Sequence, residues 1–219
     1  PAVNSPADAA DVDSLQPLLS VSNAADPDCQ DLRYVFEVYA DAGLTEPVAA
    51  TAETGIAEEV NTTAWQVPAT LYDNSSYYWR ARTYDGLTYG PWMATARFFV
   101  NTANDPPTVP LVSRPPPTSE ATVLQPTLQV VNAIDADGNT ISYNFSVYAD
   151  ENLSMPVTSK AGAVQGENGT TAWQVEVPLA DNTSYWWTVQ AVDDQGLAGG
   201  WSPAAEFFIN TFNDPPGTP

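Results

Sequence analysis

The chain has 219 residues, a formal net charge of −21 and no histidine. The missing histidine excludes histidine-based general base catalysis and histidine metal ligands. The acidic composition disfavours nucleic acid and anionic membrane surfaces as partners, because both repel negative charge. The hydrophobic fraction of 43% is ordinary for globular proteins and predicts folded domains despite 20 prolines. No apolar stretch is long enough to insert into a membrane, and no signal peptide is recognisable.

The sequence repeats itself. LRYVFEVYAD at 32–41 returns as ISYNFSVYAD at 141–150, which is 109 residues later. TTAWQV occurs twice, and FFVNTANDPP returns near the end as FFINTFNDPP. A period of this size is one whole domain, so we predict two tandem domains, residues 1–109 and 110–219.

Both ends of the sequence fall at this repeat boundary. PAVNSP at the start aligns with PLVSRP at 110–115. We therefore expect a segment of a longer array, with secretion and anchoring signals outside it.

Alternating apolar and polar residues predict β-strands throughout. Tyr34, Phe36 and Val38 share one face in the first repeat, as Tyr143 and Phe145 do in the second. Seven strands are predicted per repeat, and in the second they lie at 110–114, 126–134, 141–149, 156–161, 170–177, 184–193 and 204–211. No segment has a helical period with caps. The predicted fold is all-β, with two tandem seven-stranded antiparallel β-sandwiches.

The segments that follow each repeat are rich in proline: NTANDPPTVP at 101–110 and NTFNDPPGTP at 210–219. Proline restricts its own φ and extends the residue before it. We expect stiff connections rather than flexible linkers.

The second half of each repeat resembles a fibronectin type III domain. Leu71 lies six residues before Tyr77, and Leu179 lies six before Tyr185. This spacing is similar to that family's tyrosine corner, and the resemblance implies that the tyrosine hydroxyl bonds to the backbone upstream. The resemblance also implies an immunoglobulin-like sandwich. The family's tryptophan in the second strand is absent here, and a tryptophan occupies a later strand instead.

The junction resembles the calcium-bridged junctions of cadherin repeats. There, acids from a linker, a D-x-D loop and an A-x-D strand end meet at the boundary. The matching residues here are Asn104, Asp105, Asp135, Asp137 and Asp193. The counterparts around the other boundaries are Asp26, Asp28, Asp85 and Asp214. The match is partial, because Thr102 and Pro106 stand where cadherins carry Asp and Asn.

These acids allow two interpretations. Calcium takes six to eight oxygen ligands, chiefly carboxylates and carbonyls, and would stiffen the inter-repeat joint. Alternatively, the Asp-Pro and Asp-Gly loops only form turns, in which aspartate caps its own backbone.

Six Asn-x-Ser/Thr triplets are candidate glycosylation sites. They begin at Asn61, Asn74, Asn144, Asn152, Asn168 and Asn182.

Tryptophans recur in both repeats and raise a sugar-binding interpretation, because sugar faces stack on aromatic rings. They are Trp65, Trp79, Trp92, Trp173, Trp187 and Trp201. Strand alternation places Trp79 and Trp187 in the core, whereas Tyr78 and Trp186 point away from it. An exposed aromatic stripe would serve sugar or a neighbouring chain.

The sequence contains no phosphate loop, nucleophile elbow or zinc pattern. Cys29 has no histidine partner and is interpreted as an idle thiol.

We predict a non-enzymatic structural segment of an extracellular or cell-surface protein, of prokaryotic origin, which forms a rod, stalk or fibre. Its partners would be neighbouring repeats or copies of itself. The alternative is a carbohydrate- or receptor-binding adhesin, or an accessory module of a secreted enzyme.

Overall fold

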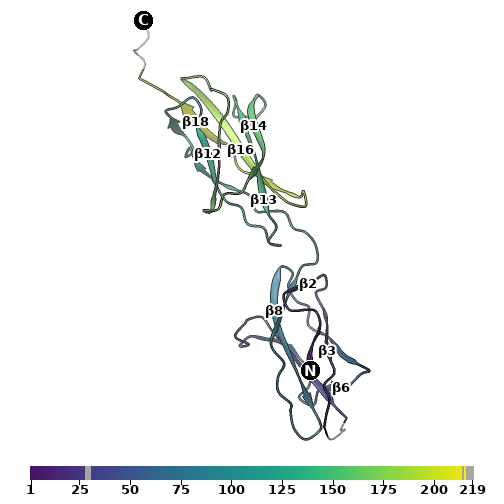
Figure 1. Ribbon diagram of the computed structural model, residues 1–219. Helices are drawn as coiled ribbons and strands as arrows, with labels where there is room; N and C mark the ends of the chain where they lie inside the picture. The colour runs from purple at the N-terminus through teal and green to yellow at the C-terminus, as the bar shows by residue number, and fades with distance from the viewer. Residues whose placement is uncertain (28–30, 214, 216–219) are drawn as a thin grey trace. The chain divides into compact units, whose positions relative to one another are not determined.

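The computed structural model describes residues 1–27, 31–213 and 215, and every regular element in them is a β-strand (Figure 1). The chain divides into two compact units, Pro1–Ala103 and Asn104–Pro219, called unit 1 and unit 2 below. The division lies before the predicted boundary at 109/110 because the segment 104–109 bonds to unit 2. None of the described residues forms a helix that is long and apolar enough to cross a membrane.

Unit 1 is a sandwich of two sheets. One sheet has the order β1-β3-β7, and the other has the order β2-β9-β8-β4-β5 with β6 paired to β4. The strands are β1 (Ala2–Ser5), β2 (Ala10–Val12), β3 (Leu18–Ser22), β4 (Arg33–Tyr39), β5 (Pro47–Ala50), β6 (Ile56–Ala57), β7 (Thr62–Gln66), β8 (Ser75–Tyr84) and β9 (Ala96–Val100).

Unit 2 repeats this plan. Its sheets have the orders β10-β12-β15 and β11-β18-β16-β13-β14, and β17 is paired to β16. The strands are β10 (Leu111–Arg114), β11 (Ser119–Ala121), β12 (Thr127–Val131), β13 (Ile141–Tyr148), β14 (Pro156–Val164), β15 (Thr170–Gln174), β16 (Thr183–Asp193), β17 (Ala198–Trp201) and β18 (Ala205–Ile209).

The predicted all-β class and the two tandem sandwiches are confirmed, but the seven-strand, purely antiparallel description is wrong in detail. Nine strands per unit occur among the described residues, and β2 and β11 pair in parallel with β9 and β18. In each unit the first part of the chain pairs with one sheet, passes a proline turn and then joins the other sheet. The added strands are too short, at two to four residues, to show an alternating pattern.

Each unit has its own hydrophobic core. Tyr34, Phe36 and Trp79 are fully buried in unit 1, and Phe145 and Trp187 are fully buried in unit 2. The Phe36 ring stacks on Trp79 with centroids 6.2 Å apart, and Phe145 stacks on Trp187 at 6.1 Å. The inward face predicted from alternation is therefore confirmed in both repeats, and each unit buries enough apolar surface for a core.

Both predicted tyrosine corners are present. The backbone N–H of Tyr72 donates to the hydroxyl of Tyr77 at 2.9 Å, and Ala180 donates to Tyr185 at 3.0 Å. Leu71 and Leu179 are buried. These bonds fasten the turn before β8 and β16 to the strand that follows it.

A second tyrosine tie occurs in each unit. The backbone N–H of Ala24 donates to the Tyr34 hydroxyl at 2.8 Å, and Ala133 donates to Tyr143 at 2.7 Å. Burial raises the pKa of Tyr34 to about 12, although the bond from Ala24 lowers it. Because the same bond occurs in both units, Ala24 in the loop after β3 and Ala133 in the loop after β12 are equivalent positions.

Candidate functional site

The candidate cation ligands lie in three segments of unit 2. Asn104 and Asp105 belong to the first of them. Asp135 and Asp137 belong to the loop between β12 and β13, and Asp193 ends β16. In the Asp135 loop, Asp135 Oδ1 accepts the backbone N–H groups of Asp137 and Asn139 at 3.0 and 3.1 Å. This is the aspartate-capped turn of the second interpretation.

Asp193 acts in the same way. It is 4% exposed, and its Oδ1 accepts the N–H groups of Gln195 and Leu197 at 2.9 and 2.8 Å. Burial would raise the pKa of Asp193, but the hydrogen bonds from Asn104, Leu197 and Gln195 outweigh it and lower the pKa overall. The carboxylate is therefore held charged by hydrogen-bond donors of the protein.

The segment 104–109 joins these two loops. Asn104 Nδ2 donates to Asp193 Oδ2 at 2.6 Å, and the Asp105 N–H donates to Asp137 Oδ2 at 2.6 Å. Farther along, the Thr108 N–H donates to the Ile134 carbonyl, and the Ile134 N–H donates to Thr108 Oγ1, both at 2.8 Å. All five predicted residues are thus brought together, and the structure adds Thr108 and Ile134.

Pro107 completes this contact. It is buried, and a Cβ placed on Gly199 would come within 2.3 Å of its carbonyl oxygen. Glycine at 199 therefore permits the close approach of the linker backbone.

Two carboxylate oxygens of this site are candidate cation ligands. Asp135 Oδ2 and Asp137 Oδ1 are buried and lack a hydrogen-bond partner, and such oxygens are suitable calcium ligands. Asp193, in contrast, has both oxygens occupied by protein donors. Across the described ranges 1–27, 31–213 and 215, no three acidic or cysteine side chains come close enough together to hold a metal. Calcium at this site would depend on the Asp135–Asp137 pair, carbonyls and water.

Of the predicted counterparts, Asp28 and Asp214 lie outside the described residues, as does Cys29. Asp85 matches Asp193 and caps its own turn, with Oδ1 accepting the N–H groups of Leu87 and Thr88 at 2.7 and 2.6 Å. These hydrogen bonds lower the pKa of Asp85.

The residues that leave each sandwich are also bonded to it. The Asn101 N–H donates to the Val12 carbonyl at 2.9 Å, and Asp73 accepts both the N–H and the hydroxyl of Thr102 at 2.9 and 2.6 Å. After unit 2, Asp181 accepts the same two groups of Thr211 at 2.9 and 2.8 Å. These bonds lower the pKa of both aspartates.

The candidate glycosylation sites differ in exposure. Four are exposed: Asn61, Asn152, Asn168 and Asn182. Asn74 and Asn144 are half-buried, and Asn144 Oδ1 accepts the Gly162 N–H at 3.0 Å. Asn61, Asn74 and Asn182 have positive φ, which asparagine tolerates better than most residues, so turn geometry alone explains asparagine there.

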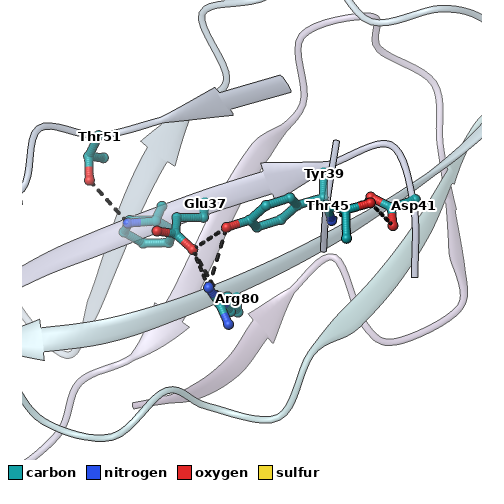
Figure 2. Close-up of polar contacts among 7 residues, drawn as sticks. Glu37, Tyr39, Asp41, Thr45, Thr51 and Arg80 are labelled. Atoms are coloured by element: carbon teal, nitrogen blue, oxygen red, sulfur yellow. Dashed lines mark hydrogen bonds and ion pairs between the residues drawn. The ribbon is translucent and has the colours of Figure 1, made fainter. Parts of the chain in front are cut away.

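Two arginines and two aromatic residues form a stack in unit 1 that the sequence did not reveal; Tyr89 is exposed, and the other three residues are half-buried. The guanidinium carbon of Arg82 lies 3.8 Å from the Tyr89 ring centroid and 4.3 Å from the Trp92 ring centroid, and the guanidinium carbon of Arg80 lies 4.2 Å from the Trp92 ring centroid. Arg80 also binds Glu37 at 2.8 Å, as Figure 2 shows. We call Arg80, Arg82, Tyr89 and Trp92 the arginine–aromatic stack.

Among the described residues of unit 2 no such stack occurs, because Thr188 and Gln190 replace the two arginines. Thr188 Oγ1 donates to the Ser202 carbonyl at 2.8 Å, and Gln190 donates to the Gly199 carbonyl at 2.9 Å. Trp201, the counterpart of Trp92, is 46% exposed. Trp65 packs against the core of unit 1, and Trp173 is buried in unit 2.

The sequence matches no protein-family model, and no curated protein matches it. Among solved structures, the chain is similar to the FN1–FN3 domains of chicken CNTN1, with 13% identity and a TM-score of 0.42 over 95% of this chain and 64% of that one. It is also similar to fibronectin(III)-like modules of Clostridium thermocellum CbhA, with 14% identity and a TM-score of 0.31 over 95% and 93% of the two chains. The sheet orders and the two tyrosine corners describe a chain of two tandem β-sandwiches.

Proposed function

We propose that the chain is a non-enzymatic structural segment of an extracellular or cell-surface tandem-repeat protein, where it acts as a spacer in a rod, stalk or fibre. The observation that carries the proposal is the anchoring of the connecting segment on both sides. Thr102 is bonded to Asp73 in unit 1, whereas Asn104 is bonded to Asp193 in unit 2. Only Ala103 lies between these two bonded residues, so little free chain is left to absorb a hinge motion.

The acidic residues support this role over a reactive centre. Asp41, Asp85 and Asp150 each accept hydrogen bonds from a backbone N–H and a hydroxyl of the same turn. Asp73 and Asp181 accept the same two kinds of bond from Thr102 and Thr211, which follow 29 and 30 residues later. These bonds lower the pKa values of all five aspartates and keep the carboxylates charged. A general acid needs the opposite shift.

Small-angle X-ray scattering of the chain tests the spacer role. We expect a pair-distance distribution with a second maximum at the separation of two beads, unchanged from low to high protein concentration at moderate salt. A single compact maximum would mean that the two sandwiches fold onto each other, and the spacer role would be lost.

Calcium is a narrower proposal at the same junction. It is supported by the two buried oxygens, Asp135 Oδ2 and Asp137 Oδ1, that have no hydrogen-bond partner. Because a bound ligand stabilises the folded state that binds it, millimolar calcium should raise the melting temperature of unit 2, and D135N/D137N should remove that increase. Magnesium is the control ion. Titration calorimetry without heat, together with an unchanged melting temperature, would rule calcium out.

A binding module is the second candidate, and the arginine–aromatic stack favours it. Tyr89 is 42% exposed and lies on Arg82, which gives an aromatic face beside positive charge in an acidic chain. Such a surface suits an anionic sugar or a receptor. Screening on a glycan array should give signals that Tyr89→Ala removes and that Tyr72→Ala, at a distant exposed tyrosine, leaves intact. An array on which both variants match the native chain would dismiss this candidate.

A further inference from the structure

The outward face of one sheet in unit 1 carries all four arginines of that unit. Residues on β4, β8 and β9 alternate between the two faces of the sheet, and Phe36, Trp79 and Phe98 are buried in the core on the inner side. We call the opposite side the basic face. Its arginines are Arg33 on β4, Arg80 and Arg82 on β8, and Arg97 on β9.

The four arginines follow a line across three strands. Arg97 is paired with Tyr78 on β8, Arg80 and Arg82 come next on the same face of β8, and Arg33 on β4 is paired with Tyr84. Residues that share a face of a strand are about 7 Å apart, so the line spans about 20 Å. An extended ligand could therefore meet all four side chains.

The charge of this sheet is opposite to that of the chain. Its strands hold four arginines and two acids, Asp11 and Glu37, a net charge of +2, whereas the chain has a net charge of −21. The equivalent strands of unit 2 hold one lysine and three acids, a net charge of −2. The basic face is therefore a local property of unit 1, and it attracts anions.

Unit 2 shows that the sandwich does not need these arginines. The strand pairs of the two units have the same registers at these positions. The equivalent residues in unit 2 are Ser142, Thr188, Gln190 and Glu206. Because the same sheet forms without a positive charge at any of the four positions, stability of the fold alone does not explain the arginines.

Arg82 has no acidic partner in the protein. Its Nε–H is buried without a hydrogen-bond acceptor, and within residues 1–27, 31–213 and 215 it forms no ion pair. The rings of Tyr89 and Trp92 lie against its guanidinium group. They stabilise the cation but supply no oxygen to its N–H groups. A carboxylate is the acceptor that fits such a guanidinium edge best.

Two further arginines keep their charge. Arg33 donates to the carbonyl oxygens of Thr54 and Gly55, both at 2.7 Å, and a carbonyl does not neutralise a cation. Arg97 is exposed. Arg80 differs, because its Nε donates to Glu37 Oε2 at 2.9 Å, as Figure 2 shows. Three of the four positive charges on the basic face are therefore available to an anion.

A chain segment that enters a sandwich leaves this side of the sheet open. In unit 2 the segment 104–109 lies against Gly199. Ala198 and Trp201, the equivalents of Tyr89 and Trp92, are nevertheless exposed there. The accessibility of the arginine–aromatic stack therefore does not conflict with a segment at the same place in unit 1.

We propose that the basic face binds a linear acidic polysaccharide whose sugar rings carry carboxylates. The carboxylates would accept N–H groups of Arg33, Arg82 and Arg97, and a sugar ring would stack on the exposed ring of Tyr89. A polymer with one carboxylate per ring suits this face better than a densely sulfated one, which the acidic remainder of the chain would repel more strongly. This inference rests on the binding module, the second candidate function, because it names the ligand of that surface.

Electrophoresis of the full chain in native gels that contain polygalacturonate tests the proposal. The buffer contains EDTA, so that calcium cannot bridge protein and polymer. We expect retardation that saturates with polymer concentration, and none in neutral dextran. Equal retardation in dextran would overturn the acidic ligand class and leave a sugar-binding module in place. Retardation in dextran sulfate but not in polygalacturonate would overturn the choice of carboxylate.

Two pairs of substitutions with the same change in net charge give the matched control. R82Q/R97Q removes two charges from the basic face and should weaken binding at least about tenfold, because bonds to carboxylates are lost. R114Q/K160Q removes two charges from unit 2 and should change binding by less than about twofold. Equal effects of the two pairs would overturn the proposal.

Arg97→Gln alone repeats the test without disturbing the arginine–aromatic stack, since Arg97 lies outside it. We expect binding to weaken about threefold, with an unchanged melting temperature, and unchanged binding would count against the basic face. If no sugar of any class binds in gels or on the glycan array, the binding module is lost together with this inference. The spacer role is tested separately by scattering and would survive either result.

Discussion

At the scale of single residues, hydrogen bonds from backbone N–H groups to side-chain oxygens hold the loops of both units. The tyrosine corner is one such bond. Removing its acceptor leaves the N–H of Ala180 without a partner, and an unpaired polar group in a partly buried site costs more than the net value of the bond.

Tyr185→Phe tests this bond. We expect a loss of about 1–2 kcal/mol in the free energy of unfolding of unit 2, measured by urea denaturation. Tyr148→Phe is the control, since no hydrogen bond of the Tyr148 hydroxyl occurs within the described residues, and it should change stability by less than about 0.5 kcal/mol. Equal losses for both variants would show that the corner bond contributes nothing specific.

The capping aspartates predict a dependence on acid. Six have lowered pKa values: Asp41, Asp73, Asp85, Asp150, Asp181 and Asp193. A carboxyl whose pKa is lower in the folded state stabilises the fold above its unfolded pKa, about 3.9, and loses this contribution as pH falls through its folded pKa. The melting temperature should be flat near neutral pH and fall steadily below about pH 4. D73N/D181N should flatten that fall, and a melting temperature independent of acid would contradict the role of these bonds.

At the scale of strands, the sequence predicts long elements well and short ones poorly. Residues 141–147 alternate strictly between core and surface, and the same alternation of apolar and polar residues in the sequence predicts β13. Ser119–Ala121 is a strand only because it lies beside β18. A segment of three residues is too short to show a pattern that would predict this pairing. Tertiary contact, not local preference, decides such segments.

The candidate site was predictable to a similar degree. Asp-x-Asp loops and the Asn-Asp-Pro-Pro sequence identified the residues that meet. The sequence could not show that Asp193 is satisfied by Asn104 and backbone N–H groups, because bond partners depend on the folded path of residues 104–109. The arginine–aromatic stack was missed for the same reason, since Tyr89 and Trp92 reach Arg82 from outside regular strand alternation.

Strand β14 is an exposed sheet edge, and it carries the one lysine of the chain, Lys160. Lys160 Nζ lies 3.6 Å from Glu176 Oε1, and both side chains are exposed. This ion pair therefore contributes little to stability. A lysine on an edge strand instead prevents pairing with another molecule. Lys160→Val should leave the unfolding free energy within about 0.5 kcal/mol and increase light scattering at high concentration. Ser159→Val, on the same strand, is the comparison, because it adds the same side chain and keeps the lysine. If Lys160→Val scattered no more light than the native chain, the lysine would not have this role.

At the scale of the whole molecule, two separate cores predict two separate unfolding transitions. Trp79 and Trp187 are each fully buried in their own unit. Replacing either with alanine leaves a cavity and should cost about 3–5 kcal/mol. In calorimetry, Trp79→Ala should lower one transition and Trp187→Ala the other. A single transition lowered equally by both variants would mean that the units do not fold independently.

The central claim is that the anchored linker, rather than a reactive group, provides the function, and the width of the inter-unit distance distribution measures it most directly. Spin labels at Ala50→Cys on β5 and Ser159→Cys on β14, both exposed strand positions, would be placed in a Cys29→Ser background. Pulsed electron–electron double resonance should then give one narrow distribution of label-to-label distances for the native linker. N104A/T108A should broaden it, because the side-chain bonds of Asn104 and Thr108 to unit 2 are removed and only the backbone bonds of the linker remain. A native distribution that is already broad, and that the double substitution does not change, would contradict the account.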